Sequence, residues 1–273
     1  MTLNLSIIVL TIIIITTTAQ YTITMATSTS SLKPGEMSEI LQNEIDHIIY
    51  LPKGYETETK TPAILFLHGA GGVNGGFDNI RGQSLTKMIL NKIVPGGDDF
   101  PFIVITPRAD KRNWTNHFDK LDALLARLIT ELNIDTDKFY LAGQSMGGNG
   151  AWEYGAKNLN MFAALVPVCG YVARKDPKTG ERVAEIAEVL KNKPIYVFHA
   201  ANDSVVSVEH SDGMVESLKK AGNTNVLYTR YDDAPGFPAG GGKGHASYEL
   251  AFKEEKLYKW LLEQSLSGNK SDL

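Results

Sequence analysis

The chain has 273 residues, of which 43% are hydrophobic and 21% are charged, and its formal net charge is −4 at pH 7. This length suits one large domain, and this composition is typical of a globular protein rather than a disordered one. Nucleic-acid binding draws on clustered Lys and Arg, which this slightly acidic sequence lacks, so we expect a small-molecule substrate and no nucleic-acid partner.

An apolar run, Leu5–Ile15, lies near the start of the chain. It has the length of a signal-peptide core and is too short to span a bilayer. We therefore expect residues 1–19 to be a signal peptide, and we expect the mature protein to be secreted and to have no stable membrane span. No basic residue precedes Lys33, however, so translation from Met25 and a cytoplasmic enzyme remain the alternative.

The next segment, residues 20–40, consists mainly of small and polar residues without periodicity, which predicts a disordered linker. We expect a catalytic domain at residues 41–265 and a disordered tail at residues 266–273. Cys169 is the only cysteine, so no intramolecular disulfide can form.

Within this domain, short apolar runs alternate with longer stretches of helical periodicity. The alternation predicts an α/β fold with a mostly parallel central sheet and helices on both faces. The expected strands are 63–67, 102–106, 139–142, 163–168, 195–199 and 226–231. The expected helices are 118–132, 148–157, 206–221 and 248–262.

The sequence Gly143-Gln144-Ser145-Met146-Gly147 lies between an expected strand and an expected helix. A serine held at a sharp strand-to-helix turn needs small neighbours two residues away on each side, and both are glycines here. This context favours Ser145 as a nucleophile for acyl transfer. Short patterns of this kind also close ordinary turns in unrelated proteins, which is the alternative interpretation.

A second glycine-rich segment, His68-Gly69-Ala70-Gly71-Gly72, follows an earlier strand. In an acyl transfer, main-chain N–H groups must stabilise the developing oxyanion. We expect Ala70 and Met146 to donate these two N–H groups, and we expect His68 to serve the structure of its loop.

Chain order indicates the acid and the base, because in this arrangement the acid follows the nucleophile and the histidine comes last. Asp203 follows the strand 195–199, and His245 lies in a glycine-rich loop ahead of the final helix. His210 also follows Asp203, but it falls within an expected helix, where we expect a surface residue. The competing candidates for the acid are Asp232 and Asp233.

His68, Asp203 and His245 are the candidate ligands for an alternative zinc site. No short-spaced pair of ligands, such as H-E-x-x-H, supports it. The sequence therefore predicts neither a metal nor another cofactor.

Four segments together resemble the esterase branch of the α/β-hydrolases: Leu67–Gly72, Tyr140–Gly148, Phe162–Gly170 and Gly244–Tyr248. That branch includes dienelactone-hydrolase-like enzymes, polyhydroxybutyrate-depolymerase or feruloyl-esterase-like enzymes, and proteins called predicted peptidases. The resemblance implies the α/β-hydrolase fold and an early antiparallel strand within residues 48–55. Dienelactone hydrolases carry a cysteine nucleophile where this chain has Ser145, so the resemblance does not extend to their specific activity.

Together the motifs predict a serine carboxylesterase that acts on a small-molecule ester through an acyl-enzyme, with Ser145, Asp203 and His245 as its triad. Two alternatives remain open. One is a serine peptidase that uses the same triad, and the other is a catalytically inactive binding protein with this fold. The sequence does not determine the natural ester or the oligomeric state.

Overall fold

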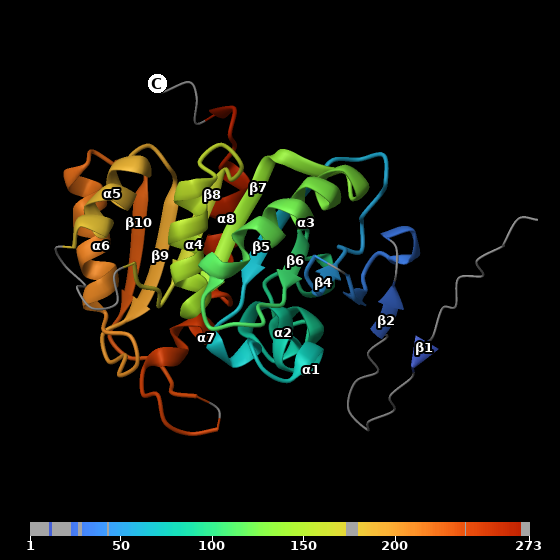
Figure 1. Ribbon diagram of the computed structural model, residues 1–273, viewed down its shortest axis with the longest axis horizontal. Helices are drawn as coiled ribbons and strands as arrows, with labels where there is room; N and C mark the ends of the chain where they lie inside the picture. The colour runs from blue at the N-terminus through green and yellow to red at the C-terminus, as the bar shows by residue number, and fades with distance from the viewer. Residues whose placement is uncertain are drawn as a thin grey trace, which may run out of the picture.

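The computed structural model describes residues 11–12, 23–26, 29–42, 44–172, 180–237 and 239–268. Over these residues one twisted sheet runs through the molecule, in the order β1-β2-β3-β4-β6-β5-β7-β8-β9-β10 (Figure 1). The strands are β1 (Thr11–Ile12), β2 (Ile23–Ala26), β3 (Met37–Ile40), β4 (His47–Tyr50), β5 (Thr61–Leu67), β6 (Ile103–Pro107), β7 (Ile134–Gln144), β8 (Ala164–Val168), β9 (Ile195–Ala200) and β10 (Val226–Tyr231).

The helices alternate with these strands along the chain. They are α1 (Gly76–Arg81), α2 (Ser84–Leu90), α3 (Phe118–Glu131), α4 (Met146–Lys157), α5 (Glu181–Val189), α6 (Glu209–Lys220), α7 (Tyr248–Ala251) and α8 (Glu255–Glu263). Short 3-10 turns are η1 (Thr29–Ser31), η2 (Ala70–Gly72), η3 (Gly97–Asp99), η4 (Trp114–His117) and η5 (His245–Ser247).

The strands from β5 to β10 all pair in parallel, whereas β4 is antiparallel to both of its neighbours, β3 and β6. The parallel strands β6, β8 and β9 are buried along their whole length, as expected for strands covered on both faces. The predicted fold class and the early antiparallel strand are therefore confirmed.

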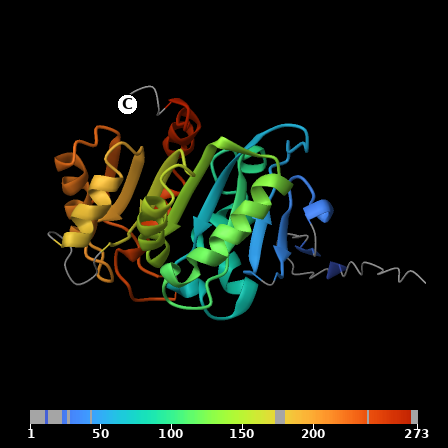
Figure 2. The same ribbon diagram turned by 45° about the horizontal axis from the view of Figure 1, so that its top comes forward.

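Alternate side chains of the central strands enter two separate hydrophobic cores. On β5, Leu65 and Leu67 pack into one core together with α3, α4, α5 and α6. Ile64 and Phe66 point the other way and pack with α1, α2, α7 and α8. Helices therefore cover both faces of the sheet, and Figure 2 shows α3 and α4, in green, lying across one of them. The two cores hold the carboxyl ends of the parallel strands in fixed positions along one edge.

Both predicted boundaries of the domain need correction. Met37–Ile40, expected within a disordered linker, forms the buried strand β3 and pairs with β4. Backbone pairing extends this edge further, because β2 is parallel to β3. At the other end, the N–H groups of Leu266 and Ser267, expected in a disordered tail, bond to Asp137 on β7. Sequence composition did not reveal these pairings, because their partners lie elsewhere in the chain.

Several helices also differ from expectation. The predicted helix 248–262 is two helices, α7 and α8, and the short helices α1, α2 and α5 were not predicted. Apart from β1, the expected signal peptide lies outside the described residues, so its cleavage stays a prediction. Of the helices in the described ranges, none is both long enough and apolar enough to cross a bilayer.

Candidate active site

Ser145 lies at the turn between β7 and α4, with φ 55° and ψ −114°. These angles are unusual for a residue with a side chain and mark a strained turn. The turn requires glycine at two places: a Cβ on Gly143 would overlap the carbonyl oxygen of Gly147, and a Cβ on Gly147 would overlap that of Leu67. The Ser145 N–H donates to the carbonyl oxygen of Val168 at 2.8 Å, which fixes the turn against β8.

The structure brings Ser145, His245 and Asp203 together from three separate parts of the chain. His245 Nε2 is 2.8 Å from Ser145 Oγ, and His245 Nδ1 is 2.8 Å from Asp203 Oδ2. The carboxylate can only accept, so His245 Nδ1 must carry a hydrogen, and in the neutral ring Nε2 is free to accept the serine proton. This tautomer is the one that a general base beside a nucleophilic serine requires.

Four donors surround the carboxylate of Asp203, whose side chain is fully buried. Oδ1 accepts the N–H groups of Val205 and Val206 at 2.8 and 2.9 Å. Oδ2 accepts from His245 at 2.8 Å and from His199 at 3.1 Å. Burial alone raises the pKa of Asp203, but the hydrogen bonds from His199 and His245 outweigh it and hold this pKa well below its usual range. The carboxylate therefore stays ionised beside His245.

The segment that carries His245 is fastened on both sides. The Ser204 N–H donates to the carbonyl oxygen of Lys243 at 2.8 Å, and the Ala246 N–H donates to that of Pro235 at 2.9 Å. Gly244 has φ 77° immediately before η5, a conformation that favours glycine. The ring of His245 is 3% exposed and packs edge-on against Phe237. These contacts hold the imidazole between Ser145 and Asp203.

Ala70 and Met146 are the first residues of η2 and α4, respectively. The N–H group of the first residue of a helix has no acceptor within that helix. Both residues line the same cavity as Ser145. Their role as oxyanion donors stays a prediction, and the positive end of the α4 dipole lies at the serine.

His68 supports the loop that carries Ala70. Its Nδ1 donates to the carbonyl oxygen of Gly69 at 2.7 Å, and its Nε2 accepts the N–H of Ala109 at 3.0 Å. Burial lowers the pKa of His68 to about 4, so the ring is neutral at pH 7. Trp114 donates its indole N–H to the carbonyl oxygen of His68 at 3.0 Å. The expected structural role of His68 is confirmed.

A second polar cluster lines the cavity beside this loop. Gln144, which directly precedes the serine, is buried and accepts a hydrogen bond from the hydroxyl of Ser84 on α2. Its amide nitrogen donates to Gln83 at 3.3 Å. Gln83 and Ser84 were not singled out from the sequence, because nothing local indicates that α2 packs against this turn. The cluster ties the end of β7 to α2.

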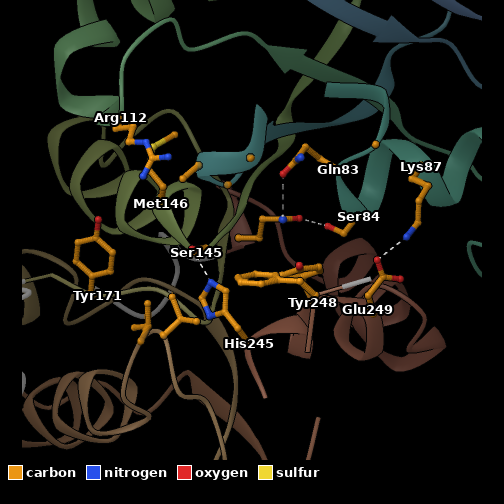
Figure 3. A pocket seen from close by; sticks show the side chains of 18 residues that line it. Gln83, Ser84, Lys87, Arg112, Ser145, Met146, Tyr171, His245, Tyr248 and Glu249 are labelled. Atoms are coloured by element: carbon orange, nitrogen blue, oxygen red, sulfur yellow. Dashed lines mark hydrogen bonds and ion pairs between the residues drawn. The ribbon is translucent and has the colours of Figure 1, made fainter. Parts of the chain in front are cut away.

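Ser145 and His245 open into a cavity of about 590 Å³. Figure 3 shows Tyr171 and Arg112 on one side of Ser145, and Gln83, Lys87 and Glu249 on the other. Lys87 and Glu249 pair at 2.6 Å and join α2 to α7. Tyr171 lines this cavity, whereas Trp114 is fully buried under the loop of His68.

His210 was the other histidine that follows Asp203, and Asp232 and Asp233 were the competing candidates for the acid. His210, expected at the surface, is only 8% exposed, and its ring lies 6.0 Å from that of Tyr171. That prediction was wrong, because His210 lies on the buried part of α6, whose residues Met214 and Leu218 pack into the core. Asp232 and Asp233, the alternative acids, are both exposed, and Asp233 accepts a hydrogen bond from Asn202 instead of from His245.

The proposed zinc ligands His68, Asp203 and His245 do not form a single cluster. Among the described residues, the one group with suitable spacing is Cys169, Asp203 and His245, whose ligand atoms lie within 4.8 Å of one another. Burial raises the pKa of the Cys169 thiol, so sulfur stays protonated there. His245 Nδ1 already donates to Asp203. These atoms are arranged for hydrogen bonding rather than for holding a cation.

Comparisons with known proteins agree with this geometry. The Esterase family model, described as "Putative esterase", matches residues 38–221. A bifunctional acetylxylan esterase/xylanase, XynS20E, from Neocallimastix patriciarum is 25% identical over 128 residues, which cover 45% of this chain and 18% of that protein. This chain thus corresponds to less than a fifth of that relative.

Solved structures give the same picture. A thermostable esterase superimposes with a TM-score of 0.61 at 28% identity, covering 81% of this chain and 59% of its own. The feruloyl esterase module from Clostridium thermocellum superimposes with a TM-score of 0.55 at 17% identity, covering 77% of this chain and 81% of its own. With the sheet order and the strained serine turn already described, the family match shows that the chain belongs to the Esterase family of the α/β-hydrolase superfamily.

Proposed function

We propose that this protein is a serine carboxylesterase that works through an acyl-enzyme. The single observation that carries the proposal is the hydrogen-bond chain from Ser145 Oγ through His245 to Asp203, with both steps at 2.8 Å. A serine hydroxyl is a weak nucleophile until a base accepts its proton. We assign His245 as that base and Asp203 as the group that orients it.

In the proposed reaction, Ser145 Oγ attacks the ester carbonyl carbon while its proton passes to His245 Nε2. The N–H groups of Ala70 and Met146 donate to the oxyanion that forms. His245 then returns the proton to the leaving alcohol, and the carbon–oxygen bond of the ester breaks. A water molecule, deprotonated by His245, releases the acid and regenerates Ser145. Asp203 stays ionised throughout and stabilises the imidazolium.

The size and the lining of the cavity support esters that join an acyl group of modest size to a polar alcohol. Tyr171, Val205 and Phe237 give the cavity apolar and aromatic surface, whereas Gln83 and the Lys87–Glu249 pair add polar groups. The similarity to an acetylxylan esterase and a feruloyl esterase module is consistent with acetyl or aryl-acid esters of carbohydrates as the substrate class.

The test is hydrolysis of a chromogenic short-chain ester by the full chain and by Ser145→Ala. The wild-type protein should turn over the ester and react with a fluorophosphonate probe, and the variant should do neither, because nucleophile loss leaves only background catalysis. Equal rates for the two proteins would overturn the assignment. A matched anilide, added to the same assay, separates an esterase from a peptidase, since amide cleavage requires protonation of a much poorer leaving group.

A further inference from the structure

The hydrogen bonds around Asp203 continue past the carboxylate into β9 and α6. His199, near the end of β9, is fully buried. Its Nε2 lies 3.1 Å from Asp203 Oδ2 and 3.0 Å from the carbonyl oxygen of Val206. Its Nδ1 lies 2.8 Å from the hydroxyl oxygen of Ser211 on α6. The chain of contacts that begins at Ser145 therefore runs on through His199 to Ser211.

The partners of His199 determine where its hydrogen lies. A carboxylate and a carbonyl oxygen can only accept hydrogen bonds, so the Nε2 that faces both must carry a hydrogen. The hydroxyl of Ser211 can then donate to Nδ1. The Nε2–H of His199 on β9 therefore donates to Asp203 Oδ2, the same atom that accepts the Nδ1–H of His245.

Asp203 Oδ2 is thus shared between two imidazoles, one on each side. The backbone donors of Val205 and Val206 hold only Oδ1, so without His199 the position of Oδ2 would depend on His245 alone. A hydrogen bond to a carboxylate also withdraws part of its negative charge. His199 therefore affects both the direction and the basicity of the oxygen that faces His245.

We infer that His199 is a positioning residue, which acts through Asp203 to set the orientation and the strength of His245 as a base. The inference rests on the proposed esterase function. Asp203 is the acceptor for both rings. Tyr248 on α7 also faces this cluster, with its ring 6.3 Å from that of His245, and burial raises the pKa of its hydroxyl, so it is neutral at pH 7. A further titratable group beside the cluster is Cys169, directly after β8. Because burial raises the pKa of that thiol, it brings no charge to the cluster at neutral pH.

Two polar substitutions separate this role from a merely structural one. In His199→Gln, the side-chain amide nitrogen can occupy the place of Nε2 and still donate to Asp203. In His199→Asn, the shorter side chain places its amide near the position of Nδ1, so the bond to Asp203 is lost while the residue stays polar. The measurement is kcat/KM for a chromogenic ester across the pH range.

For His199→Asn, we expect kcat/KM to fall about tenfold, the value of one hydrogen bond to a charged group. The acid limb of its pH profile should move to higher pH by about half a unit, because a carboxylate that has lost one donor stabilises the imidazolium of His245 more strongly. For His199→Gln, both the rate and the acid limb should return most of the way to wild type.

His47→Asn serves as the matched control, because His47 is equally buried but lies on β4 and bonds to the carbonyl oxygen of Ile45. It should leave the acid limb unchanged. Equal loss of activity in both His199 variants with an unmoved acid limb overturns the inference, as does wild-type behaviour of His199→Asn. If instead the wild-type protein hydrolyses no ester, the proposed function fails, and the two failures are therefore distinguishable.

Discussion

Gly147 on α4 packs so closely against the carbonyl oxygen of Leu67 on β5 that a side-chain carbon cannot fit between them. This contact joins the turn that carries Ser145 to the strand that leads into the loop of Ala70. Main-chain packing thereby helps to hold the proposed nucleophile in register with one of the two expected oxyanion donors. Gly147 is therefore required for two reasons: the turn itself needs a glycine, and Leu67, which is distant in sequence, leaves no room for a side chain.

Gly147→Ala should accordingly destabilise the protein and disorder the site. We expect the free energy of unfolding to fall by about 3 kcal/mol or more, because backbone atoms must move to admit the methyl group. Urea unfolding followed by fluorescence would measure this loss. Gly54→Ala is the matched control, since no atom lies within 4 Å of a Cβ at Gly54, and it should change stability by no more than about 0.5 kcal/mol. Equal stability of the two variants would contradict the role of the contact.

Asp203→Asn should leave the protein folded but slow its reaction. An amide at this place can present its N–H to His245 and favour the wrong tautomer, which we expect to lower kcat by about 10⁴-fold. The rate of labelling by a fluorophosphonate should fall in parallel. Asp232→Asn changes an exposed carboxylate on the neighbouring loop and should retain wild-type kcat. A greater loss in Asp232→Asn than in Asp203→Asn would reassign the acid.

Stability should fall as the pH drops from about 6.5 to about 4. Burial lowers the pKa of His47 and of His68 from 6.5 to about 4 in the folded protein. The unfolded chain therefore binds more protons than the folded chain within this window, and each histidine removes about 3 kcal/mol of stability by its lower end. Above pH 6.5 both rings are neutral in the folded and in the unfolded chain, so this loss of stability is absent.

Urea unfolding at a series of pH values would check this dependence. In His47→Asn, which keeps a donor for the carbonyl oxygen of Ile45, the loss between pH 6.5 and pH 4 should shrink by about half. An unchanged pH dependence in that variant would show that carboxylates, rather than the two buried histidines, control the acid sensitivity.

Gln144→Leu should weaken the link between β7 and α2. The substitution leaves the buried hydroxyl of Ser84 without its acceptor, at an expected cost of about 1 to 3 kcal/mol in the free energy of unfolding. Ser84→Ala with Gln144→Leu removes both partners, and this double variant should recover part of that loss. A double-mutant cycle on thermal unfolding would measure the coupling, and strict additivity of the two changes would contradict it.

The sequence alone predicted the features that depend on local sterics and on periodicity. Continuous apolar runs identified the buried parallel strands, because a strand covered on both faces needs apolar side chains on both. The glycines at 143 and 147 identified the serine turn, because their need arises from backbone geometry. Chain order then selected Asp203 and His245 as candidates, and the structure places His245 beside Ser145 and Asp203 on the other side of His245.

Features that depend on contacts between distant segments were decided only by the tertiary structure. No sequence pattern singles out His199, yet it donates to Asp203. His210 was expected at the surface, yet it is buried on α6. Strand β3 was assigned to a linker, because its pairing with β4 leaves no mark in its own composition. Local sequence fixes the conformations a segment can adopt, but packing of whole elements against one another decides which side chains are buried and which of them meet.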